Sequence, residues 1–223
     1  MKKEIKKGVI LNYLNIIIGG LLVFLLEPFI IKKLGQSTYG VYTLINSFTN
    51  CLTLFEFGLG TTIIHYVSKF NIEKKEKQKK ELFSMMLVIY FLIIIVITIS
   101  SIILYNLIDN IFNYSLTINQ IKIAKKIFII TAINVNITVL NSLFSSILNG
   151  YEKFFINRII ILISTILNCI LTIIVLIINP KALTLSLVSL ITSIMILLGN
   201  IFYVAAKLKI KIKLNTEWNK DLF

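Results

Sequence analysis

Two glutamates stand inside long apolar runs of the sequence. Glu27 lies in LLVFLLEPFII, and Glu56 lies in NCLTLFEFGLG. Where such runs cross a membrane, an ionisable side chain is costly and is a candidate for ion or substrate binding. Pro28 kinks a helix and frees a carbonyl beside Glu27, and glycines next to Glu56 let the chain bend. For Glu27, pairing with Lys32 or Lys33 is an alternative role.

Amide and hydroxyl side chains recur at helical spacing within the same apolar runs. At 3.6 residues per turn they fall on one face in five of six runs, most sharply around Asn134 and Asn141. Such faces line a water-filled cavity for a polar solute, or they join helices through hydrogen bonds, and both interpretations stay open. The candidate substrate-binding residues inside these runs are Asn12, Asn15, Glu27, Asn46, Asn50, Glu56, Asn134, Asn141 and Asn168.

No set of residues with a catalytic or metal-binding pattern accompanies these side chains. His65 is the only histidine, and Cys51 and Cys169 are far apart in the sequence. A membrane-embedded polyprenyl-phosphate sugar transferase, the enzymatic alternative, would need Asp-rich motifs that hold a metal and a phosphate. The loops instead carry a few glutamates among many lysines. We therefore predict that the chain is not an enzyme and has no metal and no cofactor.

Six apolar blocks set the fold class. The chain of 223 residues is 57% hydrophobic and 15% charged, and a membrane-spanning helix needs about 20 mostly apolar residues. The blocks are continuous rather than alternating, which predicts helices and not barrel strands. We expect an all-α, polytopic membrane protein with a six-helix lobe over residues 1–206 and a basic tail over 207–223. The expected spans are Val9–Ile31, Gly40–Val67, Leu82–Leu107, Ile121–Leu148, Phe155–Ile178 and Ala182–Ala206.

The basic residues predict how these spans are oriented. Seventeen of the 23 lysines and arginines fall in the two tails and in the second and fourth loops. Because cytoplasmic loops carry the excess of Lys and Arg, both termini are expected on the cytoplasmic side of the membrane. This segregation also explains the net charge of +13 without nucleic acid as a partner.

Several short motifs occur in a characteristic order along the chain. They are PFIIKKLG at 28–35, YGVY at 39–42, FEFGLG at 55–60, YVSK at 66–69 and LNGYEKF at 148–154. With the six-span pattern, this series resembles the Wzx-type polysaccharide flippases. These belong to the multidrug/oligosaccharidyl-lipid/polysaccharide exporter superfamily.

The resemblance implies a function and a larger architecture. Such proteins move undecaprenyl-pyrophosphate-linked oligosaccharide to the outer leaflet, through two six-helix lobes that rock around a central cavity. The chain would then be one lobe that needs a second lobe or a second copy, with 207–223 as a tail or the start of a linker. Arg158, with Lys153, would capture pyrophosphate at the inner end, or would be an ordinary positive-inside residue. Membrane lipids are the other expected partner.

A drug or cation antiporter of the same superfamily is the rival transport function. That function needs an ion site centred on carboxylates, and Glu27 with Glu56 would supply part of it.

Overall fold

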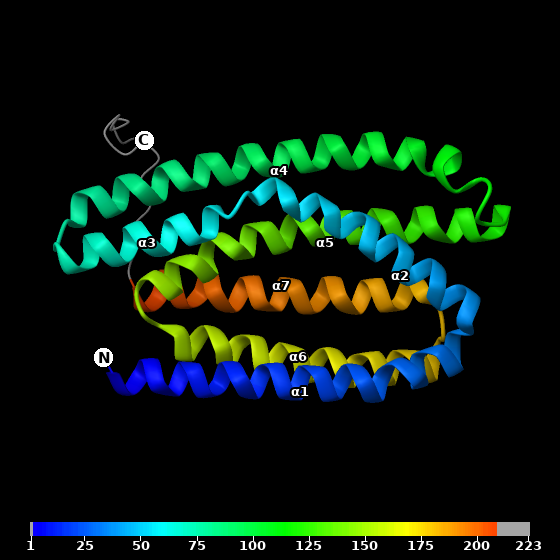
Figure 1. The fold of residues 1–223 in the computed structure, drawn as a ribbon, viewed down its shortest axis with the longest axis horizontal. Helices are drawn as coiled ribbons and strands as arrows, with labels where there is room; N and C mark the ends of the chain where they lie inside the picture. The colour runs from blue at the N-terminus through cyan, green and yellow to red at the C-terminus, as the bar shows by residue number, and fades with distance from the viewer. Residues whose placement is uncertain (1, 209–223) are drawn as a thin grey trace.

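Helices make up almost all of the chain that the structure describes, residues 2–208 of a computed structural model (Figure 1). Most of the predicted tail, 207–223, lies outside the described residues. The elements are α1 (Lys2–Leu34), α2 (Gln36–Asn50), the 3₁₀ segment η1 (Cys51–Glu56), α3 (Leu59–Ile72), α4 (Glu76–Phe112), α5 (Ile118–Gly150), α6 (Phe154–Ile178) and α7 (Ala182–Lys207).

Five of these helices are long and apolar enough to cross a membrane, namely α1, α4, α5, α6 and α7. They coincide with five of the six predicted spans, and most extend beyond the predicted ends. The prediction of an all-α, polytopic membrane protein is therefore confirmed. The added turns are largely polar or basic, because a helix continues past the apolar core of a bilayer into the interface.

The second predicted span is not one helix. The expectation of a continuous helix over Gly40–Val67 is wrong, because the chain there forms α2, η1 and α3 in succession. The break falls at Phe57 and Gly58, which have φ angles of 48° and 73°. A right-handed helix cannot pass through two consecutive left-handed residues.

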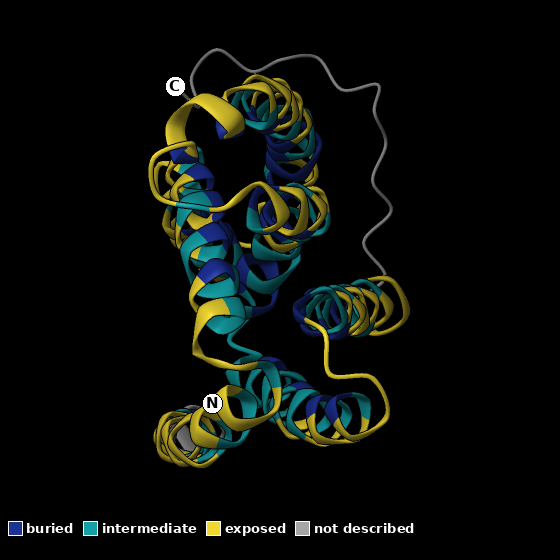
Figure 2. Ribbon diagram, turned by 90° about the vertical axis from the view of Figure 1, so that its right-hand side faces the viewer, coloured by how far each residue is buried: buried dark blue, intermediate teal, exposed yellow. Residues whose placement is uncertain are grey.

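Helix α5 lies at the centre of the bundle. It packs against α7, α4, α2 and α3, whereas α1 packs mainly on α6, at the far side of the molecule (Figure 2). None of the most apolar stretch of α1 is buried. In a membrane the exposed apolar side chains of α1 and α4 face lipid or another protein surface, so their exposure does not conflict with a stable fold.

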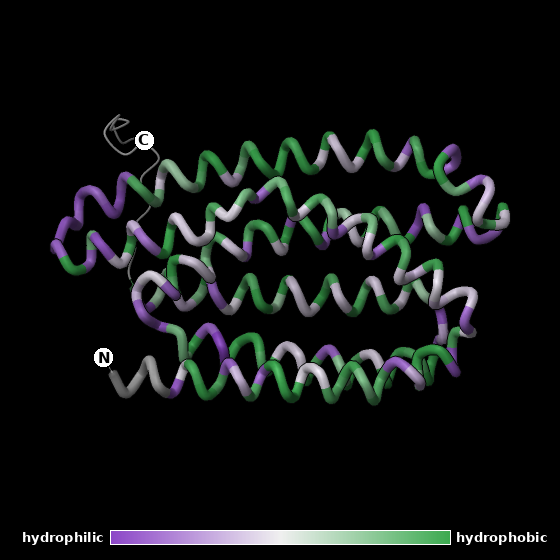
Figure 3. The backbone as a smooth tube through the Cα atoms, viewed as in Figure 1, coloured by the Kyte–Doolittle hydropathy of each residue, from purple (hydrophilic) through white to green (hydrophobic). Residues whose placement is uncertain are grey.

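Successive connections alternate between the two ends of the bundle. The N-terminus, the α3–α4 turn and the α5–α6 turn share one end, which we call the basic end because residues 69–80 there include six lysines (Figure 1). The hydropathy colouring shows polar segments concentrated at the ends and apolar segments between them (Figure 3). This alternation matches the predicted grouping of loops, and the cytoplasmic location of the basic end stays a prediction.

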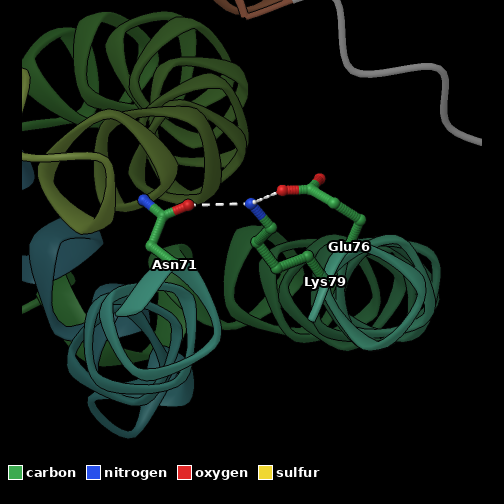
Figure 4. Close-up of polar contacts among 3 residues, drawn as sticks. All are labelled: Asn71, Glu76 and Lys79. Atoms are coloured by element: carbon green, nitrogen blue, oxygen red, sulfur yellow. Dashed lines mark hydrogen bonds and ion pairs between the residues drawn. The ribbon is translucent and has the colours of Figure 1, made fainter. Parts of the chain in front are cut away.

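A buried lysine holds the turns at the basic end together. Lys79 Nζ lies 2.6 Å from Glu76 Oε1 and donates to Asn71 Oδ1 at 2.7 Å (Figure 4). It also lies 5.1 Å from the ring centre of Tyr151, in the α5–α6 turn. Burial raises the pKa of the Tyr151 phenol above its usual range, so this ring stays neutral beside the lysine. The α3–α4 and α5–α6 turns are thereby fixed to one another.

Candidate functional site

The helix break between η1 and α3 gives the site its shape. Phe57 is not a glycine, and holding it in the left-handed region costs about 1–3 kcal/mol, a strain often found at functional sites. Hydroxyl groups support the backbone on both sides of the break. Thr53 Oγ1 donates to the Asn50 carbonyl at 2.7 Å, and Thr61 Oγ1 donates to the Gly58 carbonyl at 2.7 Å.

Glu56 ends η1, directly before the break, and it is partly buried between three elements. Its Oε1 accepts a hydrogen bond from the Tyr90 hydroxyl of α4 at 2.9 Å and another from the Ser142 hydroxyl of α5. Tyr90 is fully buried. Oε2 accepts no hydrogen bond from the described residues. Glu56 therefore joins the break to α4 and α5 and keeps one oxygen available.

A cavity of about 640 Å³ opens beside this carboxylate. Its walls combine glycine and hydroxyl side chains with a few apolar ones. Gly60 permits the close approach of α3 to α5 at this wall, because a Cβ there would lie 2.8 Å from Ser146 Oγ and 3.4 Å from Glu56 Oε1. None of the described lining residues is a lysine or arginine. The lining residues are Thr53, Leu54, Glu56, Phe57, Gly58, Gly60, Thr61, Ile64, Ser142 and Ser146.

A smaller cavity of about 210 Å³ lies between α1 and α6, near the basic end. Asn12 and Arg158 both line it, and Asn15 Nδ2 donates to the Arg158 carbonyl at 3.0 Å. Gly8 permits the close approach here, since a Cβ would lie 2.7 Å from Phe154 Cβ. Asn12, Asn15 and Arg158, three of the predicted residues, thus lie together at a place separate from Glu56.

The deeper asparagines mostly bridge helices. Asn141 Oδ1 accepts from Asn200 Nδ2 of α7 at 2.8 Å, and Asn168 Nδ2 donates to Thr192 Oγ1 of α7 at 3.0 Å. Asn157 of α6, which is buried, donates to Ser145 and Asn149 of α5 at 2.8 and 3.0 Å. For these side chains the helix-joining interpretation describes the contacts better than a common cavity.

The other predicted residues lie apart from Glu56. Glu27 is exposed and accepts from the Tyr39 hydroxyl at 3.3 Å, and the ion pairs among the described residues do not include it with Lys32 or Lys33. The remaining three are on α2 and α5. Asn46 donates to the Tyr42 carbonyl at 2.9 Å, Asn50 is exposed, and the Asn134 Oδ1 atom is buried with no hydrogen-bond partner among the described residues.

Sequence reasoning missed the two donors that hold Glu56. Tyr90 is a polar side chain in the apolar run from Leu87 to Ile97, which was the signal that could have identified it. Ser142 lies next to Asn141 and gave no separate signal. No group of three or more His, Cys, Asp or Glu side chains that could hold a metal ion occurs among the described residues.

These features define a class of protein. Long apolar helices, with one span interrupted beside an ionisable side chain and an open cavity at that break, together describe a multi-pass membrane protein. The MatE family model matches residues 16–174, so the chain belongs to the MatE family. Members of this family are membrane transporters of the exporter superfamily, not enzymes. A search of curated proteins and a search of solved structures found no match.

Proposed function

We propose that this chain is one lobe of an exporter that moves a lipid-linked oligosaccharide across the bacterial cytoplasmic membrane. The observation that carries the proposal is the open cavity at Glu56, where a carboxylate and four hydroxyl side chains lie among apolar ones beside the helix break. Its volume of about 640 Å³ is within the range of about 300–1,000 Å³ that small-molecule sites occupy. Sugars need such convergent donors and acceptors.

Glu56 is the residue on which binding depends in this proposal. Its Oε1 is held by Tyr90 and Ser142, and its Oε2 accepts hydrogen bonds from sugar hydroxyls. A bond to a charged acceptor is stronger than one between neutral groups, about twofold. The fixed carboxylate is thus preorganised for a polyhydroxylated head group.

The proposed cycle requires a second wall. Alternating access exposes one cavity to each side in turn, by movement of one lobe against another. We propose that the cavity face of η1, α3 and α5 works against a second six-helix lobe or a second copy of this chain. The bonds from Glu56 to α4 and α5 keep this wall rigid while it moves.

One observation favours cation or drug antiport as a second candidate function. The described lining of the Glu56 cavity has a carboxylate and no basic side chain, which suits a cationic cargo. The two functions differ in what the Glu56→Gln variant loses. A flippase loses surface glycan, whereas an antiporter loses resistance to cationic compounds.

The test is complementation in a strain that lacks its own glycan flippase. The chain is expressed alone and with a co-expressed C-terminal lobe, each with and without Glu56→Gln. We expect surface glycan only with the second lobe. Glu56→Gln should lower the amount of surface glycan at least about tenfold, which corresponds to a loss of about 1.4 kcal/mol in binding free energy. Restoration of surface glycan by the chain expressed alone, if that chain purifies as a monomer, would disprove the two-lobe proposal. Drug resistance without surface glycan would establish the antiporter instead.

A further inference from the structure

A second cavity lies along α3, between the Glu56 cavity and the basic end. Its volume is about 510 Å³, and we call it the α3 mouth. It is lined by Ile64, His65, Ser68, Lys69, Ile72 and Glu73. Ile64 lines both this cavity and the one at Glu56, so the two adjoin on the same helix.

The α3 mouth presents uncommitted nitrogen donors. His65 and Lys69 are four residues apart, so they are neighbours on one face of α3. Within the described part of the chain, no hydrogen bond or ion pair engages the Lys69 ammonium or the His65 ring nitrogens. An anion that enters this cavity therefore meets donors that do not have to leave another partner.

The one acid in the lining is already neutralised. Lys75 Nζ lies 2.8 Å from Glu73 Oε2. The hydrogen bond from Lys75 holds the pKa of the Glu73 carboxyl below its usual range, so this group stays ionised and paired. The charge of Lys69 contributes less to this lowering than Lys75 does, and the two lysines outnumber the one carboxylate.

The remaining lining residues are Ser68, whose hydroxyl donates to the Gly150 carbonyl at 3.1 Å, and two isoleucines. Ile64 is partly buried, and Ile72 is 82% exposed at the end of α3. A cavity that has a lysine ammonium beside exposed isoleucine at a membrane interface suits an amphiphile with an anionic head better than a free anion.

We infer that the α3 mouth binds the phosphate of the cargo's lipid anchor while the sugar occupies the Glu56 cavity. This inference rests on the proposed function and deepens it. Gly60 and Lys69 are nine residues apart on α3, or about 14 Å at 1.5 Å per residue, which sets the separation of the two subsites. The reverse orientation would bring a phosphate against the Glu56 carboxylate, and like charges at close range repel.

The proposed phosphate site is thus on α3 rather than on α6. The resemblance to flippases made Arg158 a candidate for this role, with an ordinary positive-inside residue as the alternative, and its cavity of about 210 Å³ lies between α1 and α6. That cavity shares no lining residue with the one at Glu56. A single cargo molecule reaches from the α3 mouth to Glu56 along one helix, without crossing the bundle.

Binding of a short polyprenyl pyrophosphate to the purified full chain tests the assignment. Farnesyl pyrophosphate is titrated by calorimetry in detergent micelles, with inorganic pyrophosphate and farnesol as separate arms. We expect Lys69→Gln to weaken farnesyl pyrophosphate binding about tenfold or more, as for loss of one charge-assisted hydrogen bond. Lys69→Arg should stay within about threefold, since it keeps a charged donor. Lys77→Gln is the control, because that lysine is on the same end and its side chain is 90% exposed.

Each outcome bears on the inference. Equal weakening by Lys69→Gln and Lys77→Gln would mean diffuse attraction to a basic surface and would overturn it. Inorganic pyrophosphate that binds as tightly as farnesyl pyrophosphate would overturn the lipid-anchor assignment. Circular dichroism of each variant verifies folding, and His65→Gln provides a second, independent substitution.

The failure of this inference and that of the proposed function are distinguishable. The probe carries no sugar, so Glu56→Gln should leave its binding unchanged. Binding that depends on Lys69, without any surface glycan in the complementation assay, would overturn oligosaccharide transport and keep a site for a phosphate-bearing lipid. Transport that depends on Glu56, with probe binding independent of Lys69, would overturn the α3 mouth alone.

Discussion

Replacement of Glu56 by alanine isolates the energetic role of the hydrogen bonds at the helix break. The substitution removes the acceptor of two hydroxyl groups, those of Tyr90 and Ser142. Ser142 lines the cavity, so its hydroxyl can turn to water. Tyr90 is fully buried and loses its carboxylate acceptor, so the Ser142 side chain is the partner that remains for its hydroxyl. Loss of a hydrogen bond to a charged group costs about 1.5–3 kcal/mol, and we expect Glu56→Ala to lower the free energy of unfolding by about 2 kcal/mol.

Glu56→Gln is the matched control, since glutamine keeps an acceptor oxygen at the same position. We expect it to change the free energy of unfolding by less than about 1 kcal/mol, because both hydroxyls still have a partner. Stability that is retained in Glu56→Gln, with transport lost, would separate the structural role of the side chain from its charge.

A double-mutant cycle tests the reasoning directly. Tyr90→Phe removes the buried donor, so in the Glu56→Ala background it should recover most of the loss. The expected coupling energy between the two positions is about 1–2 kcal/mol. The measurement is denaturant unfolding in detergent micelles, followed by circular dichroism. If the changes in the free energy of unfolding caused by Glu56→Ala and Tyr90→Phe add within about 0.5 kcal/mol, the cost does not come from the Tyr90 hydroxyl losing its acceptor.

Three further predictions concern packing, the basic end and orientation. Gly150→Ala should lower the free energy of unfolding by about 1–3 kcal/mol, because its Cβ would lie 2.6 Å from a side-chain carbon of α3, whereas Gly19→Ala, with no atom within 4 Å, should not destabilise. Lys79→Ala should cost about 1–3 kcal/mol through loss of a charged hydrogen bond in a buried position, and Lys77→Ala should stay within about 0.5 kcal/mol; equal values would contradict the role of burial. In a chain without its two native cysteines, an impermeant thiol reagent added outside cells should label Asn113→Cys and miss Lys77→Cys, and the opposite labelling would invert the topology.

The five continuous spans could be predicted because length and hydropathy decide them. In lipid the backbone must satisfy its own hydrogen bonds, so an apolar run of more than about 20 residues becomes a helix with little influence from its neighbours. The motif FEFGLG indicated flexibility at Glu56. It did not reveal a left-handed Phe57, because that conformation is rare for a residue other than glycine.

The site was predicted less well, because helical spacing gives the face of a side chain and not its partner. Asn141 and Asn168 do lie on polar faces, and both find partners on α7. Glu56 lines a cavity and takes its donors from α4 and α5, and the pairing of Tyr90 with Glu56 spans 34 residues. No periodicity within one helix encodes such a contact.

The distribution of polar groups has a physical explanation. Apolar packing gives little drive for association in lipid, so hydrogen bonds such as those from Asn157 and Asn200 help to hold α5, α6 and α7 together. An amide committed to another helix is not available to a solute. The cavity at Glu56 has no asparagine among its described lining residues. Its hydroxyls include those of Thr53 and Thr61, which also bond to the local backbone, and its glycines have no side chain to desolvate. A solute can bind to and leave such a wall without depriving a buried amide of its hydrogen-bond partner. Asparagines in the wall would need new partners in every state of a transport cycle.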